Sequence, residues 1–120
     1  MKVDEGVREE LIKNLRDWLD DFNFTMKKII DSMEKAKSVE EIMKLKKKLL
    51  LKAIDMLPIF AEECYFCILC SSECSICKYK DYHGVCHNSN SDYMKIIEKR
   101  RELMELIEKL YYKGEKYKED

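Results

Sequence analysis

The sequence lacks the residues and segments that mark several common protein classes. Its 120 residues include no glutamine, one proline and three glycines, so the turns of a strand-rich protein would have few of their usual residues. No apolar run reaches the roughly 18 residues needed to cross a membrane, and the charged N-terminus is not typical of a secretory signal. We therefore expect a mainly helical protein of the cytoplasm that does not enter a membrane.

An excess of charge of one sign is also missing. The chain has 23 Lys and Arg against 24 Asp and Glu, which gives a formal net charge of −1. The chain as a whole should therefore show no general attraction to nucleic acid or anionic lipid. Two basic clusters still lie on predicted helices and form a candidate phosphate-binding strip, although lysines interleaved with glutamates are also an ordinary hydrated surface. These clusters are Lys46, Lys47 and Lys48, and Lys99, Arg100 and Arg101.

Three long segments carry apolar residues at helical spacing, which predicts amphipathic helices. Ser38, followed three residues later by Glu41, forms a capping box at the start of the second segment. Pro58 interrupts that second apolar stripe, so we expect a break there and a new helix after it. The predicted helices span residues 4–37, 39–57, 58–69 and 91–113.

These segments predict an all-α fold with a single domain over residues 1–120. The expected architecture is an antiparallel bundle of three to four helices, with a metal-organised cysteine loop at about residues 64–90 before the last helix. A first helix of this length would extend roughly 50 Å if straight. We therefore expect either a bend at Asn23–Thr25 or a homodimer that buries part of the helical surface. The predicted core or dimer contacts are Leu11, Leu15, Trp18, Phe22, Ile96 and Leu103.

Cysteine is concentrated in one part of the chain. Five of the six cysteines lie between residues 63 and 77, and Cys86 follows. In a reducing cytosol, such clusters bind metals or carry out redox chemistry more often than they form structural disulfides. The composition, without Gln and rich in Lys, Glu and Ile, is typical of hyperthermophiles, in which intracellular disulfides do occur. Disulfides and thiols without metal therefore stay as alternatives.

The spacing of the cysteines favours zinc. Cys64 and Cys67 form one C-x2-C pair, and Cys74 and Cys77 form another. Two such pairs supply four thiolates for one tetrahedral zinc ion. Cys86 and His87 are alternative ligands, and Cys70 is an additional cysteine. A closed site of this kind would stabilise the loop by on the order of 10 kcal/mol and perform no chemistry.

This pattern resembles a loose group of small phage and prokaryotic proteins that have a C-x2-C, a second C-x2-C and a further Cys. The resemblance covers Cys64 to Cys86, about a fifth of the chain. The sequence departs from the group at Lys78, where proline is common, and at Cys70. The resemblance implies zinc ligation and no activity. The ligands that it implies are Cys64, Cys67, Cys74, Cys77 and Cys86.

A second interpretation of the same cysteines is an iron–sulfur cluster. The spacing Cys64-x2-Cys67-x2-Cys70-x3-Cys74 matches the cluster-binding run of bacterial ferredoxins. The proline that ends that run is missing, since Ser75 follows Cys74. A single 4Fe-4S cluster with Cys86 as a remote ligand is the alternative, and it would make the chain a redox or electron-transfer protein.

Catalytic patterns are weak. His83 and His87 flank Cys86, but no orienting acid, oxyanion loop or glycine-rich phosphate loop accompanies them. An enzyme is therefore disfavoured. The sequence predicts a small cytoplasmic interaction module with structural zinc, whose partner is a protein or a second copy of the chain rather than nucleic acid.

Overall fold

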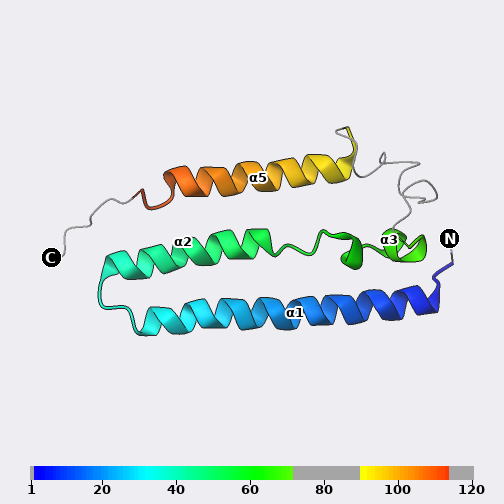
Figure 1. The fold of residues 1–120 in the computed structure, drawn as a ribbon, viewed down its shortest axis with the longest axis horizontal. Helices are drawn as coiled ribbons and strands as arrows, with labels where there is room; N and C mark the ends of the chain where they lie inside the picture. The colour runs from blue at the N-terminus through cyan, green and yellow to red at the C-terminus, as the bar shows by residue number, and fades with distance from the viewer. Residues whose placement is uncertain (1, 72–89, 114–120) are drawn as a thin grey trace. The chain divides into compact units, whose positions relative to one another are not determined.

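The computed structural model describes residues 2–71 and 90–113, and these residues form helices and no strand. The prediction of an all-α chain is confirmed for this part of the sequence. None of the described helices is long and apolar enough to cross a lipid bilayer. The elements in chain order are α1 (Glu5–Glu34), α2 (Val39–Asp55), the 3-10 turn η1 (Ala61–Glu63), α3 (Tyr65–Leu69) and α5 (Asp92–Leu110) (Figure 1).

Helix α1 begins at a side-chain cap and continues through its predicted weak point. The carboxylate of Asp4 accepts a hydrogen bond from the backbone N–H of Val7 at 3.1 Å. No break occurs at Asn23–Thr25, because the following residues Met26 and Ile29 are buried. Packing of an apolar face contributes more to helix stability in proteins than local propensity does.

Helix α2 begins at the predicted capping box. Ser38 Oγ accepts a hydrogen bond from the backbone N–H of Glu41 at 3.1 Å. The Glu41 carboxylate accepts at 2.9 Å from the backbone N–H of Lys37, one residue before the position expected for this motif. At its other end the helix stops at Asp55, because Pro58 disfavours helical geometry in the residue before it.

The segment after Pro58 differs from the continuous helix predicted over residues 58–69. It forms the short turn η1 and then α3, which starts only at Tyr65. Helix α5 is also shorter than predicted. It begins after Ser91, whose buried hydroxyl accepts from the backbone N–H of Met94 at 3.1 Å. It ends at Leu110, close to Tyr112, which adopts a left-handed backbone conformation (φ 45°).

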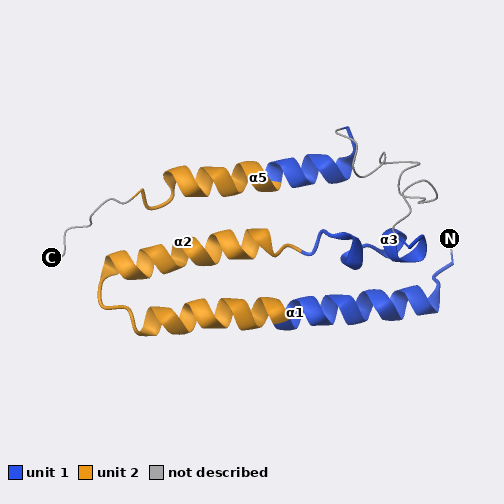
Figure 2. Cartoon of the chain, in the orientation of Figure 1, with its two compact units in different colours: residues 1–20, 58–99 blue, residues 21–57, 100–120 orange. Residues whose placement is uncertain are grey.

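The chain divides into two compact units (Figure 2). Unit 1 comprises residues 1–20 and 58–99, and unit 2 comprises residues 21–57 and 100–120. In unit 1, the backbone N–H of Asp4 donates to the Tyr65 hydroxyl at 2.8 Å. The side-chain amide of Asn14 donates to the Glu62 carbonyl at 2.9 Å. These bonds attach the start of α1 to the segment that carries the first cysteines, while the expectation of a single domain stays a prediction.

In unit 2, α2 runs antiparallel to the end of α5. Lys47 Nζ donates to the Glu108 carbonyl at 2.9 Å. Arg100 Nη1 donates to the Asp55 carbonyl at 3.2 Å. Residue numbers thus rise along α2 as they fall along α5, as the predicted antiparallel arrangement requires for this pair of helices.

The predicted core residues differ in how much they are covered. Four of them, on α1, are half-buried, whereas Ile96 and Leu103 on α5 are exposed. The buried apolar side chains of unit 2 include Met26, Ile29 and Tyr112. The half-buried residues are Leu11, Leu15, Trp18 and Phe22.

Candidate functional site

Three of the six candidate metal ligands lie in the described part of unit 1. Cys64 directly precedes α3 and has an extended backbone, Cys67 lies within that helix, and Cys70 follows its last residue. The other predicted ligands lie outside the described residues. These are Cys74, Cys77 and Cys86, together with His83 and His87.

Cys64 and Cys67 lie at the start of α3. They are three residues apart at the start of one helical turn, and both are half-buried. Partial burial shields a metal–thiolate site while leaving one side open to further ligands. Two cysteines separated by two residues are the pairing found in structural zinc sites.

Cys70 has a different environment. It is 8% exposed, and its thiol donates a hydrogen bond to the Phe66 carbonyl at 2.9 Å. This is the geometry of a buried thiol that donates to the backbone of its own helix. The residues 2–71 and 90–113 contain no cluster of three or more His, Cys, Asp or Glu side chains that could hold a metal ion.

An acidic side chain adjoins the first cysteine. Glu63 Oε2 is buried and has no hydrogen-bond partner among the described residues. Burial raises the pKa of the Glu63 carboxyl above its ordinary value, and the neighbouring Glu62 raises it further. The residue beside Cys64 therefore takes up a proton more readily than an ordinary glutamate.

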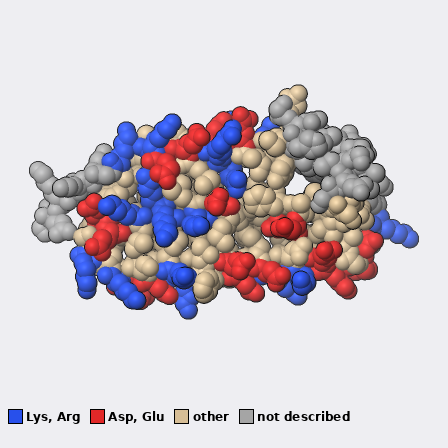
Figure 3. Space-filling view, in the orientation of Figure 1, with Lys and Arg blue, Asp and Glu red and all other residues tan. Residues whose placement is uncertain are grey.

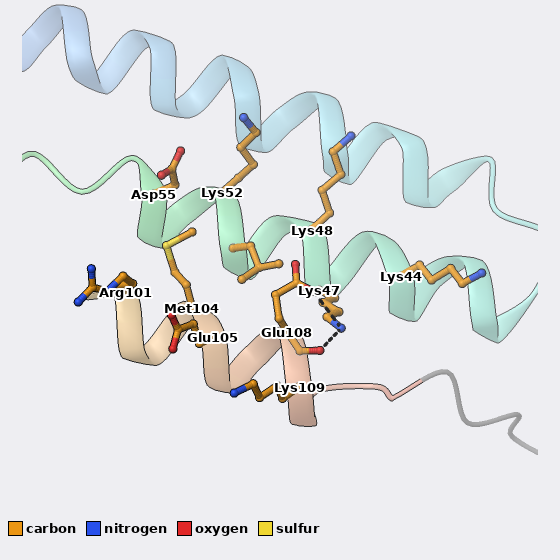
Figure 4. Close-up of a pocket in the computed structure, with 11 residues that line it drawn as sticks. Lys44, Lys47, Lys48, Lys52, Asp55, Arg101, Met104, Glu105, Glu108 and Lys109 are labelled. Carbon is orange, nitrogen blue, oxygen red and sulfur yellow. Dashed lines mark hydrogen bonds and ion pairs between the residues drawn. The ribbon is translucent and has the colours of Figure 1, made fainter. Parts of the chain in front are cut away.

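Unit 2 has a separate candidate site, a groove of about 760 Å³ between α2 and α5 (Figure 4). Leu51 and Met104 supply its apolar lining. Three carboxylates also line it, from Asp55, Glu105 and Glu108. The cations along the groove are Lys44, Lys47, Lys48, Lys52, Arg101 and Lys109.

The lysines of the groove form a row. Lys44, Lys48 and Lys52 are four residues apart on α2, so they follow one another along one face with a rise of about 6 Å per step. Lys47 is held differently, because its ammonium group also lies 3.7 Å from Glu108 Oε2. The α2 side of the groove thus carries four lysines and one carboxylate, Asp55, and the α5 side is of mixed charge.

This groove revises the basic strip predicted from sequence. Lys47, Lys48 and Arg101 do line it, but Lys46 is not among the described residues that do. Arg100 instead lies 3.9 Å from Asp55 Oδ1, and Lys99 belongs to unit 1. The predicted basic stretch KLKKK at residues 44–48 includes Lys44, but sequence reasoning missed Lys52 and Lys109, although the four-residue spacing of the α2 lysines was a visible signal.

The two units carry opposite net charge. Unit 1 contains 8 Lys and Arg against 12 Asp and Glu, and unit 2 contains 15 against 12, so their formal charges are −4 and +3 and total −1. Basic side chains gather over α2 in the space-filling view (Figure 3). The near-zero charge of the whole chain therefore hides a unit that attracts anions.

Comparison of the chain with protein-family models, with curated proteins and with solved structures finds no match. The case for a function therefore rests on the cysteine pair of unit 1 and on the groove of unit 2.

Proposed function

We propose that this chain is a small cytoplasmic interaction module in which a structural zinc ion stabilises the cysteine segment, and that its partner is a protein. The observation that carries this proposal is the placement of Cys64 and Cys67 at the start of α3, half-buried and one helical turn apart. Zinc bound by four protein ligands supplies folding free energy and no chemistry.

The proposed ligands are Cys64, Cys67 and two more groups from residues 74–87. The spacing of Cys74 and Cys77 makes them the first choice, with Cys86 and His87 as replacements. Cys70 is left out of the set, since its thiol is buried and donates to the Phe66 carbonyl. A 4Fe-4S cluster on the ferredoxin-type spacing would instead need Cys70 as a ligand.

The groove supports a protein partner over nucleic acid. A phosphate backbone would meet the Lys44, Lys48 and Lys52 row favourably, but the carboxylates of Glu105 and Glu108 on the opposite wall would repel it. An amphipathic helix can satisfy both walls and the apolar lining, with acidic residues towards α2 and an apolar residue against Leu51. We therefore propose an acidic helical segment as the partner.

Elemental analysis and an absorption spectrum test the metal proposal. The protein is purified without oxygen and without added metal. We expect about one zinc ion per chain and no visible absorption band. Iron with broad visible absorption would overturn the proposal and make electron transfer the working function. Protein that contains neither metal would also contradict it.

Exchanging single lysines on α2 tests the groove. The probe is a designed helical peptide with glutamate at every fourth position, and binding is measured by fluorescence anisotropy. We expect Lys48→Glu to weaken binding about tenfold, equivalent to about 1.4 kcal/mol, because it reverses a charge in the row.

Lys46→Glu is the matched control, since it makes the same charge change on the same helix outside the groove lining. It should change peptide affinity less than about threefold. If both variants lost peptide affinity equally, the binding would reflect only general charge attraction and not the groove. Tighter binding of a mixed-sequence DNA duplex than of the peptide would favour nucleic acid as the partner.

A further inference from the structure

Helix α5 exposes an apolar stripe. Leu103, Leu106 and Leu110 are 47%, 53% and 64% exposed, and Ile96 on the same helix is also exposed. Ile96, Leu103 and Leu110 are seven residues apart, and Leu106 falls between the last two. This is the a and d spacing of a coiled-coil seam. Scattered exposed leucines are common on protein surfaces, but three at this spacing on the unit 2 part of one helix indicate a contact surface.

The stripe is distinct from the face by which α5 packs within its own chain. The half-buried residues of α5 in unit 2 are Arg100, Met104 and Ile107, which share one side of the helix. With 3.6 residues per turn, the leucine stripe lies roughly a quarter-turn away from that side. The groove residues Arg101 and Glu105 lie on the opposite flank. The leucines therefore form a second apolar face with no role in packing against α2.

We propose that this stripe binds the same stripe of a second copy of the chain, with the two α5 helices antiparallel. In this arrangement the helices cross near Leu106, and Leu103 of each copy packs between Leu106 and Leu110 of the partner subunit. Such packing is that of a knob in a hole between two helices. A two-fold axis through the contact buries both stripes at once, so the assembly closes as a dimer.

Charged residues beside the leucine stripe favour the antiparallel orientation of the two α5 helices. Glu102 and Lys109 occupy equivalent flanking positions one heptad apart, and both are exposed. In the antiparallel pair, Glu102 lies level with Lys109 of the partner subunit, and the opposite pairing occurs on the other side of the axis. A parallel pair would instead set Glu102 opposite Ile107 of the partner subunit and would form no such charge pair. Flanking charges of this kind select partner and orientation in coiled coils.

Charge exchange in the full-length protein tests this inference, with the association constant measured by sedimentation equilibrium. Glu102→Lys and Lys109→Glu should each weaken dimerisation about tenfold, because each places like charges opposite one another. The double variant carrying both changes should return to within about threefold of the wild type, since opposite charges face each other again. In a parallel pair Glu102 and Lys109 would not face each other, so neither single variant would weaken dimerisation in this way.

Replacement of a central leucine tests the apolar contact independently of charge. Leu106→Glu should be monomeric at concentrations where the wild type is dimeric, with helicity by circular dichroism unchanged because the side chain is exposed. Leu19→Glu, at a residue of α1 with 46% exposure, is the matched control and should stay dimeric. If Leu106→Glu loses helicity, the double charge variant still decides the result.

Three results would overturn the inference. The first is a wild-type protein that stays monomeric at about 100 μM. The second is a dimer that Leu106→Glu leaves intact. The third is a double charge variant as weak as the single ones. This test is separate from that of the metal proposal, because the association constant and the zinc content are measured independently. Either proposal can therefore fail while the other holds.

Discussion

Replacing Cys64 by serine is expected to abolish zinc binding and to lower thermal stability by more than about 10 °C, whereas replacing Cys70 by serine is expected to do neither. A structural zinc site contributes on the order of 10 kcal/mol, which is as large as the total stability of many domains. Loss of one ligand from a closed four-coordinate site removes most of that contribution. Metal content by mass spectrometry and melting by circular dichroism are the measurements.

The Cys70 variant is the control that separates the two metal hypotheses. Its serine hydroxyl can still donate to the Phe66 carbonyl, which accepts from the thiol at 2.9 Å in the wild type. A zinc site on Cys64, Cys67 and later residues would therefore keep its metal in Cys70→Ser. Metal loss from both variants would indicate that Cys70 is a ligand, as the ferredoxin-type spacing requires.

Truncation of Ile29 to alanine should destabilise the protein by about 2–4 kcal/mol, which is the usual cost of truncating a buried isoleucine to alanine. The side chain is 6% exposed and belongs to the apolar core of unit 2. For a chain of this size the loss corresponds to a fall in melting temperature of about 10 °C. Chemical denaturation, with the slope of the transition compared between variants, gives the free energy directly.

The neighbouring Ile30 provides the control for this truncation. It is 48% exposed on the same helix, so Ile30→Ala makes the same chemical change with a cost below about 1 kcal/mol. If the two variants were equally stable, the orientation of α1 in unit 2 would be wrong. If Ile30→Ala were the more damaging, Ile30 rather than Ile29 would face the core.

The long helices were predictable because local signals and apolar periodicity agreed. The capping residue Ser38 marks the start of α2 as expected. The weak segment Asn23–Thr25 was misleading, since burial of Met26 stabilises a helix that propensity alone would interrupt. The segment from Pro58 was the hardest to predict. Pro58 accounts for the end of α2, but no local signal marks the start of the next helix at Tyr65.

The candidate sites were less predictable than the fold. Spacing identified the cysteines, but it does not show which thiols hydrogen-bond to the backbone, as Cys70 does. The groove depends on α2 lying beside α5, a tertiary contact made by Lys47 with Glu108 and by Arg100 with Asp55. Net charge was a poor guide for a similar reason, because it averages over units assembled from separated parts of the chain.

The division of the chain into two interleaved units affects how segments of its gene could be transferred. Each unit consists of two stretches that are distant in sequence, and helices α1 and α5 each contribute residues to both. A gene fragment, duplication or fusion that transfers one uninterrupted stretch would therefore carry neither unit intact. Transfer of either unit intact would need both of its separated stretches, whereas mutation can alter the cysteine pair and the lysine row one residue at a time.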